Sequence, residues 1–437
     1  MQHPETAQNG LRQFEVHPLR SAVLGEVHAR PFDLVEGPRI FLHYAFVTAG
    51  EGMQEERAWL NDLCAARGAP GVAETARFHR VPFGNGVLRW EGHSEFSTYT
   101  WHGPPPAGAE PFQGEPADHP FGDAFKAPGP LLSAVRLELR PDTPDLAAAC
   151  AIFDPVSLCV SKAEAGAARI ATDLKQDRDG RTRILVMDSS MSPQSAGTLA
   201  LRLLEIETYR TLALLGLPRA QEVSPEIRSV EETLRMISEQ LPETQGMSAN
   251  RDLLQTLSEL AASVEALAGA SAFRFGATRA YYEIVTIRLK AIVESPEIGY
   301  STLTTFLARR LGPAMQTCLA TERRLETLST RLSRAAELLR TRVDVELEEQ
   351  NRDLLDSMNR RARLQLRLQQ TVEGLSVAAV SYYIVGLIGY AAKGAQGFGL
   401  AINVPVTVAV SVPLVILGIW LLVRRVRQRH KSDEADA

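Results

Sequence analysis

Two long uncharged runs near the C-terminal end dominate the hydrophobic pattern of the chain. Nineteen uncharged residues lie between Glu373 and Lys393, and thirty more lie between Lys393 and Arg424. A helix needs about 20 apolar residues to cross a hydrocarbon core, so each run is long enough. The pattern predicts a two-helix transmembrane hairpin over 374–423, in which a short turn after Lys393 leads to a second span that begins near Val404.

Basic residues flank this hairpin on both sides, whereas its turn carries only Lys393. They are Arg360, Arg361, Arg363 and Arg367 before the first span, and Arg424, Arg425, Arg427, Arg429 and Lys431 after the second. Because basic residues stay on the cytoplasmic side, both flanks are expected there. The prediction is a multi-pass protein of a bacterial inner membrane, with two spans, both termini cytoplasmic and a basic tail over 424–437. A buried core hairpin is the alternative.

Small and aromatic residues mark the first span. Its glycines permit close helix packing, either within the hairpin or between copies of the chain. The spans hold no ionisable residue except tyrosine, which disfavours a proton relay but leaves open a pore lined by carbonyls and hydroxyls. The candidate residues for a pore or for hairpin packing are Gly386, Gly389, Tyr390 and Lys393.

The segment before the hairpin has the composition of a long helix. No proline occurs between Pro313 and Pro405, and Leu, Arg, Glu and Ala are frequent from Ala314 onward. Apolar residues step by three or four positions, as on one face of a helix. We expect a coiled-coil-like stalk helix over 313–373 that continues into the first span, with two or three separate helices as the alternative.

The rest of the chain divides by pattern into two parts. A helical cytoplasmic domain is predicted over 191–312, with helices over Ser192–Leu217, from Pro225, from Ser248 and over Tyr281–Val293. An α+β cytoplasmic domain with a mainly antiparallel sheet is predicted over 1–190. Its signals are a helix over 54–66, a hairpin turn at Gly84-Asn85-Gly86, a loop over 103–130, and strands at 39–47, 77–81, 87–93, 96–101, 132–139, 158–161, 167–173 and 182–187.

Composition narrows the function. The net charge of −5 disfavours a nucleic-acid partner. The four cysteines form no CxxC pair, so neither a zinc site nor a disulfide framework follows. The first twenty residues lack the apolar core of a secretory signal, and we expect the soluble part to stay inside the cell. Common enzyme and cofactor signatures are absent, which disfavours an enzyme without excluding one and leaves any cofactor unknown.

Two polar clusters are candidate sites. His17, Arg20, Glu26, His28 and Arg30 could bind an anion or order a subunit contact. Glu91, His93 and Glu95 alternate, so on one continuous strand they would share a face and form a metal or proton site. Structural roles are the alternative for both, because Gly92 can break that strand. The Asp177, Asp179 and Gly180 trio imitates a calcium loop but lacks its other ligands, which favours a hairpin turn.

Several motifs resemble a bacterial family of predicted membrane-anchored proteins, the domain of unknown function thirty-four twenty-two. They are His17-Pro-Leu-Arg20, Glu26-x-His-Ala-Arg-Pro31, Trp90-Glu-x-His-x-Glu-Phe96, Phe273-Arg-Phe275 with Ala280-Tyr281, and Leu364 through Ser381-Tyr-Tyr383 to Gly389-Tyr390. The resemblance covers nearly the whole chain and implies no established activity.

The order of parts also resembles the CorA-type magnesium channels, from the cytoplasmic α/β domain through the long helix to the hairpin and basic tail. That resemblance implies a homo-oligomer, typically a pentamer, whose first spans line a pore. Those channels end the first span with Gly-Met-Asn, whereas here Gly389-Tyr-Ala-Ala-Lys393 stands in its place. Lys393 would repel a hydrated divalent cation, which puts magnesium transport in doubt.

Three hypotheses follow from the sequence. The first is a non-enzymatic, CorA-like oligomeric protein for ion transport or membrane-linked gating. The second is a membrane-tethered scaffold or sensor without a pore, which holds cytoplasmic protein partners. The third is an enzyme that uses Glu91, His93 and Glu95. The expected partners are the lipid bilayer, copies of the chain and cytoplasmic proteins.

Overall fold

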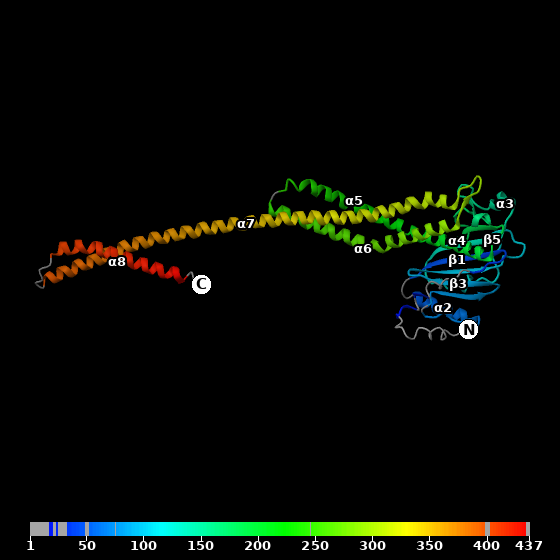
Figure 1. The fold of residues 1–437 in the computed structure, drawn as a ribbon, viewed down its shortest axis with the longest axis horizontal. Coiled ribbons are helices and arrows are strands. Elements are labelled where there is room, and N and C mark those ends of the chain that lie inside the picture. Colours follow the sequence, from blue (N-terminus) through cyan, green and yellow to red (C-terminus); the bar gives the residue numbers. More distant parts are fainter. Residues whose placement is uncertain are drawn as a thin grey trace. The chain divides into compact units, whose positions relative to one another are not determined.

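The structure is a computed structural model in which the chain divides into two compact units (Figure 1). It describes residues 17–20, 23–24, 33–48, 52–74, 76–244, 246–397 and 403–433, with side chains of the last segment up to 425. Unit 1 combines Met1–Pro242 with Gln255–Ala336. Unit 2 combines Glu243–Leu254 with Glu337–Ala437.

A nine-stranded mixed sheet forms the centre of unit 1, in the order β2-β3-β4-β1-β5-β8-β7-β6-β9. Only β5 and β8 pair in parallel, and the other neighbours pair antiparallel. The α+β prediction is therefore confirmed. The strands are β1 (Arg39–Val47), β2 (Phe78–Phe83), β3 (Gly86–Gly92), β4 (Phe96–Gly103), β5 (Leu131–Pro141), β6 (Cys159–Ala163), β7 (Ala168–Thr172), β8 (Thr182–Asp188) and β9 (Ser295–Pro296).

Alternation along the strands gives one face of the sheet an apolar core. Leu42 of β1, Trp90 of β3 and Trp101 of β4 are buried there, and α2 (Gly52–Ala66) covers them with Leu60. Burial of a large apolar side chain contributes about 2 to 3 kcal/mol, so this cluster is a major source of stability for unit 1.

Two turns follow their sequence signals. Residues 84 and 85 join β2 to β3, as the Gly-Asn-Gly signal predicts. Asp177 lies in the turn before β8, where its Oδ1 accepts hydrogen bonds from the amides of Asp179 and Arg181, each at 2.9 Å. That carboxylate stabilises a turn, which confirms the structural interpretation of the calcium-like trio.

Four long helices follow β8 along the chain, with the short strand β9 between the third and the fourth. They are α4 (Pro193–Leu214), α5 (Gly216–Gln240), α6 (Met247–Ile292) and α7 (Leu303–Gly397), after the short α3 (Leu146–Cys150) and a 3-10 turn at Glu164–Gly166. Ser192 caps α4, because its Oγ accepts a hydrogen bond from the Ser195 amide at 3.1 Å. Two helix predictions were wrong: Pro225 lies inside α5, and residues 281–292 belong to α6.

A single carboxylate links the end of the sheet to the beginning of α7. The Oε1 atom of Glu294 accepts a hydrogen bond from the Ser161 hydroxyl of β6 at 2.6 Å. Its Oε2 accepts one from the Thr304 amide in the first turn of α7 at 2.9 Å. Glu294 thus ties α7 to β6 next to the two-residue strand β9.

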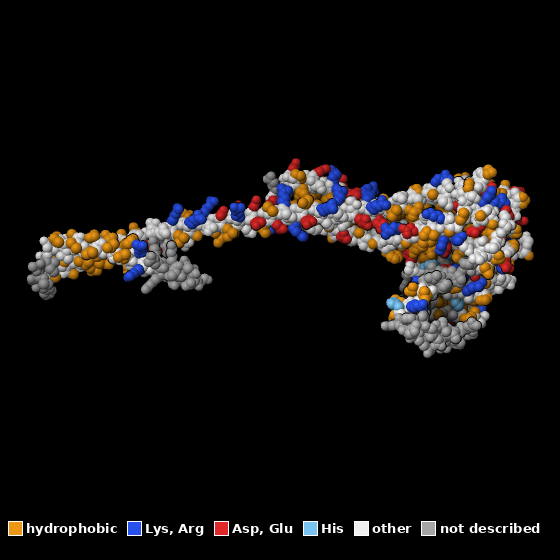
Figure 2. Space-filling view, in the orientation of Figure 1, with side chains coloured by type: hydrophobic (Ala, Val, Ile, Leu, Met, Phe, Trp, Pro, Cys, Tyr) orange, Lys and Arg blue, Asp and Glu red, His pale blue; other side chains and the backbone are white. Residues whose placement is uncertain are grey.

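The helix α7 runs without a break from Leu303 to Gly397 and includes Pro313. The prediction of one unbroken long helix is therefore confirmed, although the helix begins ten residues earlier than expected. In unit 2 it is followed by α8 (Val404–Asp433). Figure 2 shows hydrophobic side chains covering these two helices where both are apolar, with Lys and Arg side chains gathered on α7 just before that stretch.

Candidate functional site

Among the described residues, two helices are long and apolar enough to cross a membrane, judged by length and composition. They are α7 and the Val404–Arg425 part of α8. In the most apolar stretch of α8, no residue is buried inside the protein. The core helix of a soluble domain, in contrast, is mostly buried. Unit 2 therefore presents a wide apolar surface that its own described side chains do not cover.

One face of α7 packs against α8 in this hairpin. Ser381 and Ala392 are buried on it, and a groove of about 410 Å³ lies between α7 and α8 beside Ser381. A Cβ atom on Gly389 would come within 3.4 Å of Val408 Cγ2 in α8. Among the four sequence candidates, Gly389 is thus the residue that packs the hairpin.

Tyr390, the next residue, projects about 100° away from Gly389 around the helix, whereas Gly386 and Lys393 lie three residues before and four residues after Gly389 and flank it. A Cβ atom on Gly386 would meet no atom of the described residues within 4 Å, and Tyr390 is 75% exposed. Lys393 is also exposed, as is Tyr383, which lies seven residues before Tyr390. A spacing of seven is about two helical turns, so the phenol groups follow one line. This line carries phenol hydroxyl groups that lipid tails cannot satisfy.

The same line continues along α7 before the apolar stretch. Leu354, Val372 and Tyr390 are spaced by 18 residues, which equals five turns of an α-helix, so they lie directly above one another. Leu368 stands 18 residues before Gly386 in the same way. Leu354 is 59% exposed, and Leu368 and Val372 are exposed as well. We name this row of side chains, from Leu354 to Tyr390, the α7 line.

The second sequence candidate is divided between two structural elements. Strand β3 ends at Gly92 and β4 begins at Phe96, so His93 and Glu95 lie in the turn. The condition of one continuous strand through Glu91, His93 and Glu95 is therefore not met, because the strand ends at Gly92, as the alternative stated. Among the described residues, no group of three or more His, Cys, Asp or Glu side chains could hold a metal ion.

Both carboxylates of this set are paired with arginines instead. Glu91 accepts from Arg89 Nε at 2.6 Å within β3. Glu95 accepts from Arg274 Nη2 at 2.7 Å and from the Tyr281 hydroxyl at 2.6 Å, both on α6. Burial, followed by the bond to Glu95, raises the pKa of Tyr281. The turn therefore fastens α6 to the sheet.

The first sequence candidate lies mostly outside the described residues. Glu26, His28 and Arg30 belong to that part. His17 and Arg20 are exposed, and the backbone amide of Arg20 donates a hydrogen bond to the carbonyl of His17 at 2.9 Å. The anion site or subunit contact at these five residues stays a prediction.

Sequence reasoning missed a polar layer between the sheet and α4. His43 of β1 is buried, with Nδ1 at 2.7 Å from Thr100 Oγ1 and Nε2 at 2.8 Å from Thr208 Oγ1 of α4. Burial, and then the charge of Arg89, lowers the pKa of His43 to about 3. The imidazole is therefore neutral at physiological pH. The signal was the alternation of β1, which turns His43 away from the apolar face.

A cavity of about 310 Å³ lies next to this layer. Arg89, Glu205 and Arg288 line it, and Arg288 Nε lies 2.6 Å from Glu205 Oε2. Burial raises the pKa of Glu205, and the neighbouring Arg288 opposes that rise. Because both arginines are paired with carboxylates, the charges of this cavity are already balanced.

Comparison with protein families identifies the family of the chain. The family model described as "Protein of unknown function (DUF3422)" matches residues 15–430. The chain belongs to this family. No curated protein and no solved structure matches it. The family resemblance stated from the motifs is confirmed, whereas the resemblance to CorA-type channels stays a prediction.

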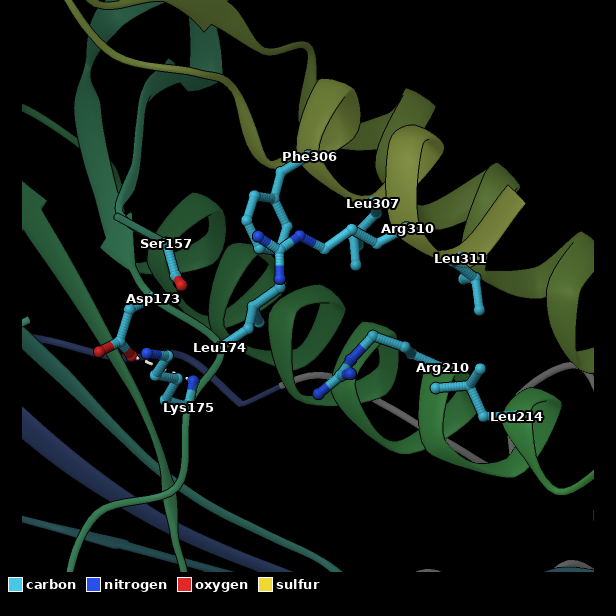
Figure 3. A pocket seen from close by; sticks show the side chains of 10 residues that line it. All are labelled: Ser157, Asp173, Leu174, Lys175, Arg210, Leu214, Phe306, Leu307, Arg310 and Leu311. Carbon is cyan, nitrogen blue, oxygen red and sulfur yellow. Dashed lines mark hydrogen bonds between the residues drawn. The ribbon is translucent and has the colours of Figure 1, made fainter. Parts of the chain in front are cut away.

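This DUF3422 chain has a further cavity, of about 170 Å³, where α4 and the first turns of α7 meet the end of β7 (Figure 3). Lys175, Arg210 and Arg310 bring three cations to it, and Asp173 is the only acidic residue among the described side chains that line it. Phe306 and several leucines give it an apolar part. All of these residues belong to unit 1. We name it the Arg310 cavity.

Proposed function

We propose that the protein is a two-span membrane protein that assembles with copies of itself and surrounds a pathway for small ions with the first spans. The observation that carries the proposal is the α7 line. Its stalk part exposes Leu354 and Leu368, and its spanning part exposes Tyr383 and Tyr390 on the face away from α8.

The stalk part supports self-association. Leu354 precedes the apolar stretch by about 20 residues and the Arg360–Arg367 cluster by six, so it lies outside the hydrocarbon core in the proposed topology. Lipid tails do not cover it there. Identical helices that bring the same apolar row together would bury it, as in a parallel coiled coil. The partner proposed for this apolar row is therefore the same row on a second copy of the chain.

The spanning part supports a pathway. Phenol hydroxyls in a hydrocarbon core need hydrogen-bond partners, and a shared polar interior would supply them. Gly386, about 40° from Tyr390 around the helix, leaves room beside this line. Lys393 follows at the outer end, where a ring of ammonium groups would attract anions and repel divalent cations. The proposed permeant species is therefore a small anion or a monovalent ion, and magnesium is disfavoured.

The test is a mass measurement followed by a flux measurement. The full chain in lipid nanodiscs is sized by light scattering corrected for lipid, and a mass of several chains is expected. Proteoliposomes are then assayed for chloride and potassium flux, with Lys393→Glu as the variant. Flux whose preference shifts from chloride toward potassium in Lys393→Glu supports the pathway.

Two other outcomes decide against the proposal or part of it. A monomer in nanodiscs overturns self-association and the pathway together. An oligomer without flux overturns the pathway and favours the membrane-tethered scaffold, since the exposed stalk leucines would equally serve a non-conducting assembly.

A further inference from the structure

We infer that the Arg310 cavity binds a small phosphate-type oxyanion, either inorganic phosphate or the phosphate group of a small ester. The inference is independent of the pathway proposed for the hairpin, because every residue that carries it belongs to unit 1.

The charges around the cavity are unevenly compensated. Lys175 pairs with Asp154, and Arg210 pairs with Glu207. Arg310 pairs with no acidic side chain among the described residues, and its guanidinium lies 4.4 Å from the centre of the Phe306 ring. Stacking on an aromatic ring leaves the edge of the guanidinium, with its N–H groups, available to an acceptor.

The acidic residue of the lining does not supply that acceptor. Asp173 is buried, and its Oδ2 accepts a hydrogen bond from the Asp154 amide at 3.0 Å. Its Oδ1 accepts one from the Lys175 amide at 3.1 Å. Figure 3 shows the Asp173 carboxylate directed toward Lys175, whereas the Arg310 side chain extends toward Phe306 and Ser157. An anion would therefore meet Arg310 without displacing Asp173.

Backbone and cavity size fit a small ligand. Leu174, at the edge of the cavity, has a φ of 54°, a left-handed conformation that is unusual for a leucine. Such strain is often maintained where a site depends on it. The volume of about 170 Å³ lies below the roughly 300 Å³ at which pockets for drug-sized ligands begin. A tetrahedral oxyanion with its waters fits this space, and a guanidinium fork matches its oxygens.

The apolar part of the lining suggests how an ester would be held. Phe306, Leu307 and Leu311 lie along one side of α7, next to Arg310. A small organic group attached to the phosphate would contact these side chains while the oxygens contact the cations. Tighter binding of a phosphate ester than of inorganic phosphate would identify the ester as the preferred source of the oxyanion.

The experiment is calorimetric titration of the purified full chain with sodium phosphate and, separately, glycerol 3-phosphate, at low ionic strength. Arg310→Met is the test variant, and Arg309→Met is the matched control. Arg309 donates to the Ser301 hydroxyl at 3.1 Å and does not line the cavity, so the two variants lose the same charge. Loss of one bidentate charged contact should weaken binding about 10- to 100-fold in Arg310→Met.

Three outcomes decide the inference. Binding that weakens in Arg310→Met and stays within about twofold in Arg309→Met supports it. Equal weakening in both variants overturns it, because only general charge would then matter. Absence of heat with either anion in the unmodified chain also overturns it. Unchanged circular dichroism of Arg310→Met verifies that the variant is folded, as expected for an exposed side chain.

Discussion

Unit 1 and the α7–α8 part of unit 2 differ in how far their apolar and charged side chains are buried and paired within the chain. Unit 1 buries the large apolar residues of its sheet and pairs the buried Glu91 and the half-buried Glu95 with arginines. Unit 2 leaves Leu354 and Tyr390 exposed. The difference teaches that unit 1 carries the interactions it needs within itself, whereas unit 2 depends on surroundings that the single chain does not provide.

The largest expected effect comes from a charge placed on the α7 line. Leu354→Glu would put carboxylates next to one another at the centre of the proposed assembly, where like charges repel and cannot be hydrated freely. We expect the mass in nanodiscs to fall from several chains to one. Light scattering on the full chain measures this directly.

An exposed leucine off the line provides the matched control. Leu366 is 59% exposed, as is Leu354. It lies twelve residues further on, which places it about 120° around the helix. Leu366→Glu should leave the mass unchanged. A loss of assembly in both variants, or in neither, would contradict the assignment of the α7 line as the contact.

A smaller effect is expected where the turn fastens α6 to the sheet. Glu95→Gln removes the charge opposite Arg274 and leaves that guanidinium partly buried without a counter-ion. We expect a loss of about 2 kcal/mol in the free energy of unfolding. Urea unfolding in detergent, followed by tryptophan fluorescence, reports on unit 1 because Trp59, Trp90 and Trp101 lie there.

The double variant Glu95→Gln with Arg274→Met sharpens this test. It removes both charges, so its loss of stability should be less than the sum of the two single losses. Additive losses would show that Glu95 and Arg274 are not coupled across the turn.

The smallest effect is expected from acid acting on His43. Its pKa of about 3 in the folded chain lies below the ordinary 6.5, so the unfolded chain binds more protons between these values. Stability is retained above pH 6.5 and falls as the pH drops, by at most about 1.4 kcal/mol per pH unit. Between pH 7 and pH 5.5 the expected loss is about 1 kcal/mol.

His43→Gln removes the titrating group and keeps an amide that can contact both threonines. Its free energy of unfolding should change less between pH 7 and pH 5.5 than that of the unmodified chain. Identical pH dependence in the two proteins would show that His43 does not contribute. Urea titrations at the two pH values provide the comparison.

The strands of the sheet and the two apolar helices of unit 2 were predictable from the sequence because their signals are local. The apolar, β-rich composition of Arg39–Val47 identified β1 with its bounds, and the Gly84-Asn85-Gly86 turn identified the hairpin of β2 and β3. The two uncharged runs identified the apolar helices by length alone. Each of these features depends on residues close together in the chain.

The beginning of α7 was not predictable from local preference. A proline inside a helix removes a hydrogen bond and costs about 3 kcal/mol, so Pro313 indicated a helix start. Leu307 and Leu311 before it and Met315 after it are all buried. Packing of this common face offsets the local cost of Pro313 and extends the helix back to Leu303.

The partners of the candidate site were not predictable either. Glu95 and Arg274 are 179 residues apart in the sequence, and no local pattern relates them. The same is true of His43 and Thr208, which are 165 residues apart. The alternation of charged residues near Glu91 was visible, but the arginines that neutralise them were not.

The link between Glu294 and Ser161 bears on the order in which the chain folds. These residues are 133 positions apart, and β7, β8, α4, α5 and α6 all lie between them. The entropy lost on closing so long a loop must be offset by contacts formed earlier. We therefore expect strand β9 to join the sheet late, and the first turn of α7, which the same carboxylate holds, to form its contact with β6 at that stage.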